Sequence, residues 1–237
     1  MQPDGRNVMG RYRSVETYLE AEQAEFDALI RGLTPDQWAA PSLCEGWTVH
    51  DVVVHIAVHT HRTLRETLKS AEADERHRHD DPNTLAALLA SPVRARSGWE
   101  RRLQLDELLI HQQDVRRPLD LPRDISAERL AAVLDSLLTR WVGTLAGVGA
   151  RKRCHGLRLV ATDIDWSHGA GPDVLGTGEA LLMAMAGREL GPTELAGDGA
   201  RTFVSRRPDR PPADAREDPR VSRRSSVRPT RAMSSGR

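Results

Sequence analysis

The chain has 237 residues, of which 39% are hydrophobic and 29% charged, enough for one large domain or two small ones. The net charge is zero, but residues 206–237 carry ten Arg and four acidic residues, which leaves 24 basic and 30 acidic residues in 1–205. The mild excess of acidic residues in 1–205 argues against nucleic-acid binding. Two cysteines are too few for a disulfide framework. No segment resembles a membrane span or a signal peptide. We therefore expect a cytoplasmic protein with no membrane segment.

Hydrophobic periodicity predicts four helices in the first half of the chain. They cover residues 13–33, 48–70, a short segment that starts at 83 or 84, and 101–117. Residues 1–10 are expected to form a loose arm. Thr48 is the expected N-cap of the second helix, with Asp51 completing a variant capping box. Four helices with short connections predict an up-and-down bundle.

The pattern changes after residue 122. It predicts a helix over 125–145, a strand over 156–162 and a short apolar helix over 179–188. The expected fold is α+β and mostly α, with a four-helix bundle in residues 1–122 and a small α/β domain in 123–204. Residues 205–237 are rich in Arg, Pro and Ser and are expected to be disordered. The favoured interpretation of this tail is a solvated segment with no fixed partner, although its charge would suit anionic surfaces.

Two of the predicted helices carry an isolated polar stripe in apolar surroundings. Glu107 and His111 are four residues apart, so they lie on one helix face, and His55 lies within a run of valines upstream. A buried, unpaired carboxylate is costly, and two imidazoles and a carboxylate around one divalent cation would compensate it. The alternative to a metal site is that Glu107 and His111 form a surface ion pair and that His55 is a hydrogen-bonded histidine of the core.

Other side chains near these helices are further candidates. His59 follows His55 by four residues, which is a ligand spacing on one helix. Cys44 would supply a soft ligand, although a buried structural thiol is its favoured interpretation. Asp114 follows His111 by three residues and is placed to orient it from outside the ligand set. The alternative for Asp114 is an ion pair with Arg117.

A second polar group occurs after the predicted strand. Asp163, Asp165 and His168 surround a tryptophan, and their interpretation as turn residues is favoured over a catalytic one. The segment Gly-Ala-Gly at residues 169–171 is too short to predict a phosphate-binding loop.

Several segments resemble the mycothiol-dependent maleylpyruvate isomerase family, which belongs to the DinB-like metal-binding helical bundles of actinobacteria. The segments are EGWTVHDVVVH at residues 45–55, DELLIHQQDVRRPL at 106–119, LRLVATDIDWSHGAGPDV at 157–174, and residues 180–188 and 194–199. Together they span about residues 12–204. The resemblance implies a DinB-like four-helix bundle followed by the small C-terminal domain typical of this family.

The resemblance also implies a zinc-type divalent metal held by His55, Glu107 and His111, and mycothiol as the thiol cofactor. In the isomerase the thiol adds to a conjugated double bond, the bond rotates, and the thiol leaves. Three protein ligands would leave one open position, and a coordinating thiol loses its proton to become the nucleophile. The sulfur would then come from the cofactor, which fits a ligand set without cysteine.

The expected function is therefore that of a metal-dependent, mycothiol-using enzyme, an isomerase or a thiol transferase that acts on a small-molecule electrophile. Arg158 and Arg188 are candidates to hold an anionic substrate, and both are equally compatible with a solvated or paired role. The alternative is a non-catalytic metal- or ligand-binding protein, which a fourth protein ligand would favour. Family membership alone does not identify the substrate.

Overall fold

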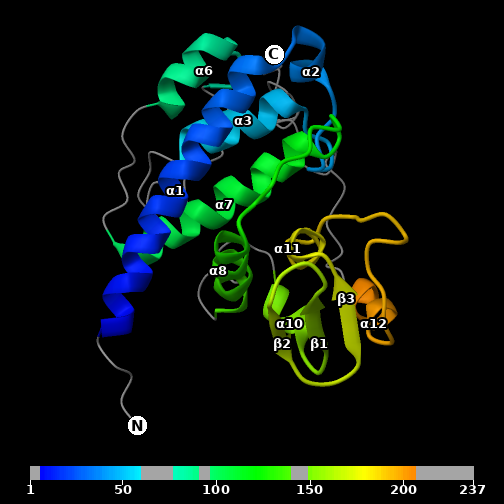
Figure 1. Cartoon of the computed structure of the whole chain (residues 1–237). Coiled ribbons are helices and arrows are strands. Elements are labelled where there is room, and N and C mark those ends of the chain that lie inside the picture. The colour runs from blue at the N-terminus through cyan, green and yellow to red at the C-terminus, as the bar shows by residue number, and fades with distance from the viewer. Residues whose placement is uncertain (1–5, 60–76, 91–96, 140–148, 207–237) are drawn as a thin grey trace, which may run out of the picture.

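The computed structural model describes residues 6–59, 77–90, 97–139 and 149–206 (Figure 1). Four helices of its first half form a bundle: α1 (Arg6–Gly32), α3 (Val49–His59), α6 (Pro82–Leu89) and α7 (Gly98–Arg116). Helix α1 packs on α6 and α7, and α3 packs on the same two helices, so the four surround one core. A short helix, α2 (Pro35–Ala39), packs on α3. The predicted four-helix bundle is confirmed.

Local sequence signals explain where the two site-bearing helices begin. Thr48 Oγ1 accepts a hydrogen bond from the Asp51 backbone N–H (3.2 Å), and Asp51 Oδ2 accepts one from the Thr48 backbone N–H (2.9 Å), as a capping box requires. Helix α7 starts at a full capping box formed by Ser97 and Glu100. Val52 and Val53 of α3 have no exposed surface, so this helix is buried where His55 follows.

Replacing Thr48 with alanine is expected to lower the free energy of unfolding by about 1 kcal/mol, because the first turn of α3 loses its side-chain acceptor. The Thr48→Ser variant keeps the hydroxyl and is the matched control. Urea denaturation measures both, and equal midpoints for the two variants would show that the cap contributes nothing.

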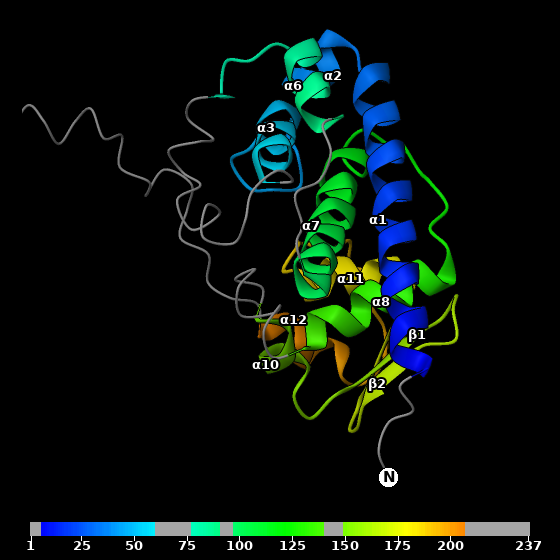
Figure 2. The same cartoon turned by 90° about the vertical axis from the view of Figure 1, so that its left-hand side faces the viewer.

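The second half joins short helices to a small sheet (Figure 2). Its helices are α8 (Ala127–Leu138), α10 (Ala150–Cys154), α11 (Gly178–Met185) and α12 (Ala200–Ser205). Its strands are β1 (Arg158–Ala161), β2 (Ser167–Gly169) and β3 (Asp173–Gly176), in the order β2-β1-β3. Strand β1 pairs antiparallel with β2 and parallel with β3, while α11 packs on β1 and β3. The fold is therefore α+β and mostly α, as expected.

Several boundaries differ from the predictions. Helix α1 begins at Arg6, so residues 6–10 are helical and do not form the expected arm. Helix α8 ends at Leu138, because the backbone of Thr139 is extended (ψ 146°), so the helix predicted over 125–145 is interrupted there, and its last part lies outside the described residues. Strands β2 and β3 and helices α2, α10 and α12 were not predicted. The expected extension of the second helix to residue 70 lies outside the described residues, as does the tail from residue 207.

The two halves share one hydrophobic core. The buried apolar cluster runs without a break from Val15 in α1 to Phe203 in α12. Helix α8 connects the halves, because it packs on α1 and α7 on one side and on α10 and α11 on the other. In the part of the chain that the structure describes, no helix is both long and apolar enough to cross a bilayer.

A buried ionic network ties α1 to the segment that leads into α8. The Glu22 side chain has no exposed surface and contacts Arg123 Nη2 at 2.6 Å and Arg129 Nη1 at 2.8 Å. Gln112 of α7 donates to Glu22 Oε1 at 2.8 Å. Glu25, one turn along α1 and partly exposed, contacts the same two arginines.

Candidate metal centre

The structure brings His55, Glu107 and His111 together where α3 packs on α7. Glu107 Oε2 lies 3.4 Å from His111 Nε2 and 3.7 Å from His55 Nε2. One donor atom from each residue lies within 4.8 Å of the other two, and the imidazole centroids are 5.0 Å apart. Three residues that are distant in the sequence therefore present their donor atoms to one point.

The donor set and its spacing fit a zinc-type cation. Zinc binds imidazole nitrogen and carboxylate oxygen at about 2.0–2.1 Å, so tetrahedral ligand atoms lie about 3.4 Å from one another. The two distances from Glu107 Oε2, 3.4 and 3.7 Å, are close to this value. The side chains are 11–28% exposed, so the cluster is mostly shielded but still partly accessible to solvent.

Electrostatics keep Glu107 in the form that binds a cation. Burial alone would raise the pKa of Glu107, but contacts with the two histidines outweigh it and hold the pKa well below its ordinary value. For His111, burial lowers the pKa, whereas contacts with Asp114, Cys44 and Glu107 raise it, and the net shift is upward. Cation binding at Nε2 would therefore have to displace a proton from His111.

Asp114 occupies the position predicted for a residue that orients His111. Its Oδ2 lies 2.8 Å from His111 Nδ1, and because an ionised carboxylate can only accept, Nδ1 carries the hydrogen. The Nε2 atom is then the one that faces Glu107. The alternative ion pair with Arg117 does not form, since Arg117 pairs instead with Glu179 and Glu194 at 2.8 Å each.

Cys44 contacts the opposite edge of the His111 ring from Glu107. Its Sγ lies 3.7 Å from His111 Nδ1 and donates to Asp114 Oδ2 at 3.1 Å. These three residues form a second group with ligand spacing. However, Arg188 Nη2 lies 3.4 Å from the Cys44 sulfur and 2.5 Å from Asp114 Oδ2, so a guanidinium already occupies this side. The side chain of His59 lies outside the described part of the chain.

The remaining candidates have structural partners. Arg158 lies on β1, half-exposed and 3.5 Å from Asp173, on a different element from the cluster. Asp163 accepts a hydrogen bond from the Gly178 backbone at the start of α11, and His168 stacks on Trp166. Asp163 and Asp165 lie in the bend between β1 and β2, which agrees with their interpretation as turn residues, whereas His168 lies in strand β2 and not in a turn.

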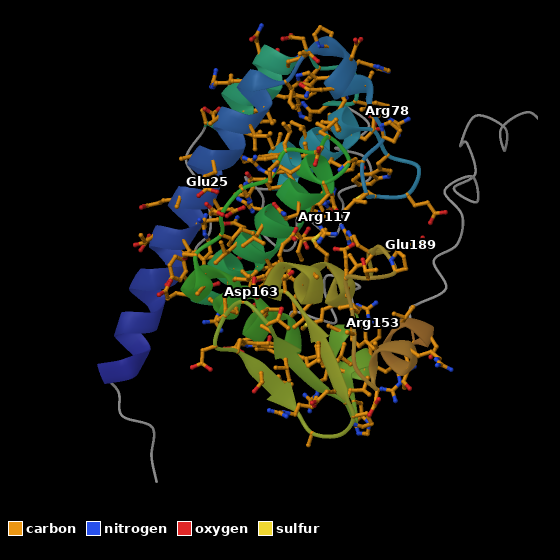
Figure 3. All side chains as sticks on the ribbon, turned by 45° about the vertical axis from the view of Figure 1, so that its right-hand side comes forward. Glu25, Arg78, Arg117, Arg153, Asp163 and Glu189 are labelled. Carbon is orange, nitrogen blue, oxygen red and sulfur yellow. The ribbon has the colours of Figure 1, made fainter. Side chains whose placement is uncertain are left out.

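A cavity of about 490 Å³ lies on the side of the C-terminal unit that Arg188 borders. Its lining includes Arg153 of α10, Glu189 and Leu190 after α11, and Phe203 of α12, and Figure 3 labels Arg153 and Glu189. Arg188 thus contacts the candidate metal centre through Asp114 and the cavity through its own surface. No local sequence pattern marks this cavity, because three helices, α10, α11 and α12, and the segment after α11 build it together.

Fold and site together define a four-helix bundle with a candidate His–Glu–His metal centre, joined to a small α/β unit. A family model described as the mycothiol maleylpyruvate isomerase N-terminal domain matches residues 19–170, more than half of the chain. The chain belongs to this family, whose named members are enzymes.

Two solved structures are similar to this fold. One is the crystal structure of a histidine-to-alanine mutant of the mycothiol-dependent maleylpyruvate isomerase, with a TM-score of 0.50 and 12% identity over 80% of this chain and 93% of that chain. The other is a crystal structure of the mycothiol-dependent maleylpyruvate isomerase, with a TM-score of 0.47 and the same identity and coverage. The comparison with curated proteins gives no match. At 12% identity the structure with the TM-score of 0.50 supports the fold alone.

Proposed function

We propose that this protein is a divalent-metal-dependent, mycothiol-using enzyme that acts on a small electrophile by isomerisation or thiol transfer. The observation that carries the proposal is the convergence of His55, Glu107 and His111, with Glu107 Oε2 3.4 and 3.7 Å from the two Nε2 atoms. Two imidazoles and one carboxylate are the protein ligands of many catalytic zinc sites, which keep a fourth position for water or substrate. Zinc is therefore the proposed ion.

The bound cation would supply Lewis acidity that lowers the pKa of a coordinating thiol. The protein's own residues would hold the ligands in place. The indole of Trp47 contacts the His55 ring edge-on, with centroids 5.2 Å apart, and Asp114 fixes the His111 ring. The site needs no protein cysteine for this chemistry, which supports a thiol that arrives as a cofactor.

The cavity bordered by Arg188, which also contacts Asp114, supports binding of a small molecule. Its walls combine apolar side chains such as Leu190 and Phe203 with the arginines at positions 153 and 201. Such a lining suits a compact organic electrophile that carries a negative group. We propose that the enzyme works in the cytoplasm, where it would meet its thiol in free solution.

Metal analysis followed by thiol titration tests this proposal. Purified protein is expected to bind one equivalent of zinc, and calorimetric titration should detect mycothiol binding to the zinc-loaded form. Removal of the ion with a chelator should abolish that binding. S-methylated mycothiol is the matched control, because it cannot form a thiolate and should bind weakly with or without zinc.

Equal binding of mycothiol before and after chelation would contradict the thiol-activation proposal. Zinc bound with four protein donors would support the alternative, a non-catalytic metal-binding protein. Two features oppose Cys44 as that fourth donor: its sulfur lies at the Nδ1 edge of His111, away from Glu107, and the Arg188 guanidinium lies 3.4 Å from it.

A further inference from the structure

We infer that Arg188 is a positioning residue for the candidate metal centre, which it controls from the C-terminal unit by fixing Asp114 and, through it, His111. This inference rests on the proposed function, because it concerns the affinity of that same site for its cation. Arg188 lies outside the residues 19–170 that the family model matches. Its role is therefore not contained in that match.

The contact between Arg188 and Asp114 is bidentate and buried. Arg188 Nε lies 2.8 Å from Asp114 Oδ1, and Nη2 lies 2.5 Å from Oδ2. The Asp114 side chain has no exposed surface, and that of Arg188 is 10% exposed. Two parallel hydrogen bonds to one carboxylate fix its plane as well as its position, which a single contact would not do.

Asp114 passes this constraint to the ligand. Its Oδ2 accepts from Arg188 and lies 2.8 Å from His111 Nδ1, so the imidazole is tied by one edge. The opposite nitrogen, Nε2, is then held 3.4 Å from Glu107. Carboxylates that bind the second nitrogen of a metal-ligating histidine commonly fix its tautomer and its orientation.

The turn after α11 aims Arg188 at this point. Helix α11 ends at Met185, and Gly187 adopts a left-handed conformation (φ 85°) that favours glycine. The Arg188 backbone N–H donates to the carbonyl of Met183 at 2.9 Å. Arg188 Nη1 also donates to the Ala186 carbonyl at 2.9 Å, which holds the guanidinium against the end of its own helix.

The same guanidinium confines cation binding to one edge of His111. Cys44, His111 and Asp114 have ligand spacing of their own, but Arg188 Nη2 contacts both the sulfur of Cys44 and a carboxylate oxygen of Asp114. A cation bound on that edge would meet a buried positive charge at close range. The arrangement directs the ion to the Nε2 edge, where Glu107 lies.

A second arginine provides a matched control. Arg117, which lies at the end of α7 and is labelled in Figure 3, also joins the two halves of the protein, through Glu179 of α11 and Glu194. Like Arg188 it makes a bidentate contact, since its Nε and Nη2 donate to the two oxygens of Glu179 at 2.8 and 2.9 Å. Arg117 contacts carboxylates of the C-terminal unit, whereas Arg188 contacts Asp114 beside His111. Loss of Arg117 therefore removes an ion pair between the halves and leaves the Asp114–His111 contact in place.

The test compares zinc affinity, measured by competition with a chromophoric chelator, in the full-length variants. Arg188→Met is expected to weaken zinc binding by about 10–100-fold, the usual effect of losing a group that orients a metal ligand. Arg188→Lys should recover part of this loss, because it keeps the charge but not the bidentate geometry. Arg117→Met should leave affinity unchanged, and the visible spectrum of the cobalt-substituted protein should change only in the Arg188 variants.

A double-mutant cycle locates the pathway. If Arg188 acts through Asp114, Arg188→Met should weaken zinc binding in the wild-type background and have no further effect on an Asp114→Asn protein. Unchanged affinity in Arg188→Met, an equal loss in Arg117→Met, or fully additive losses in the double variant would overturn the inference.

A measurement on the metal-free protein separates this inference from the proposed function. The Nδ1–H proton of His111 should give a slowly exchanging resonance in the wild type and in Arg117→Met, and should lose protection in Arg188→Met. If the wild type binds no divalent ion, the proposed function fails, whereas the positioning of His111 is still decided by this resonance. Equal protection in all three proteins would overturn the positioning role.

Discussion

Replacing Glu107 with glutamine is expected to reduce zinc affinity by more than about 100-fold, because residues that only orient a ligand already contribute about 10–100-fold. The substitution removes the one carboxylate of the cluster and the negative charge that lies 3.4 and 3.7 Å from the two imidazoles. A neutral amide is nearly the same size, so the packing of α7 is retained. Any thiol binding that depends on the ion should be lost with it.

Glu100→Gln is the matched control for this variant. Glu100 lies on the same helix, and glutamine also serves at its position of the capping box, so α7 should begin where it does now. Chelator competition should give wild-type zinc affinity for Glu100→Gln. If the zinc affinity of Glu107→Gln stays within about threefold of wild type, Glu107 is not a metal ligand. This measurement needs no substrate.

Replacing Glu22 with glutamine is expected to destabilise the protein by about 3–5 kcal/mol, the usual cost of removing one partner from a buried ion pair. The fully buried Glu22 faces Arg123 and Arg129 at 2.6 and 2.8 Å, and these side chains are themselves only 6% and 8% exposed. Without the charge, Glu25 is the one carboxylate of this network left to the two buried guanidinium groups, and Gln113 offers Arg123 only a neutral acceptor. For a chain of this size the melting temperature should fall by roughly 6–20 °C.

Glu25→Gln provides the comparison, because Glu25 contacts the same arginines but is 34% exposed. Water can replace much of what this carboxylate contributes, so its loss should cost clearly less. Urea denaturation and calorimetry measure both variants. Equal stabilities of Glu22→Gln and Glu25→Gln would contradict this prediction. They would mean that burial of a carboxylate does not determine how much it contributes to the free energy of unfolding.

Periodicity and residue type were sufficient to predict the bundle and the three clustered side chains. Glu107 and His111 share a helix face at their spacing, and the apolar run around His55 required its helix to be buried. Asp114 was predicted as a partner of His111 for the same reason, since three residues is one helical turn. Each of these predictions depends on contacts within one helix or on a strong hydrophobic pattern.

The features that were missed depend on contacts between distant segments. Arg188 meets Asp114 from 74 residues away, and no local pattern marks this pair. Strand β2 is exposed along its whole length, so it has no apolar alternation to reveal it. At the other end of the chain, residues 6–10 carry little apolar periodicity, and yet the structure continues α1 through them.

We propose above that one divalent ion is held by two imidazoles and one carboxylate, with a position left for the sulfur of a thiol. X-ray absorption at the zinc edge tests it most directly. The account predicts only nitrogen and oxygen neighbours for the zinc-loaded protein, and one sulfur neighbour at about 2.3 Å after mycothiol is added. A sulfur neighbour already present before the thiol is added, or none after it, would contradict the account.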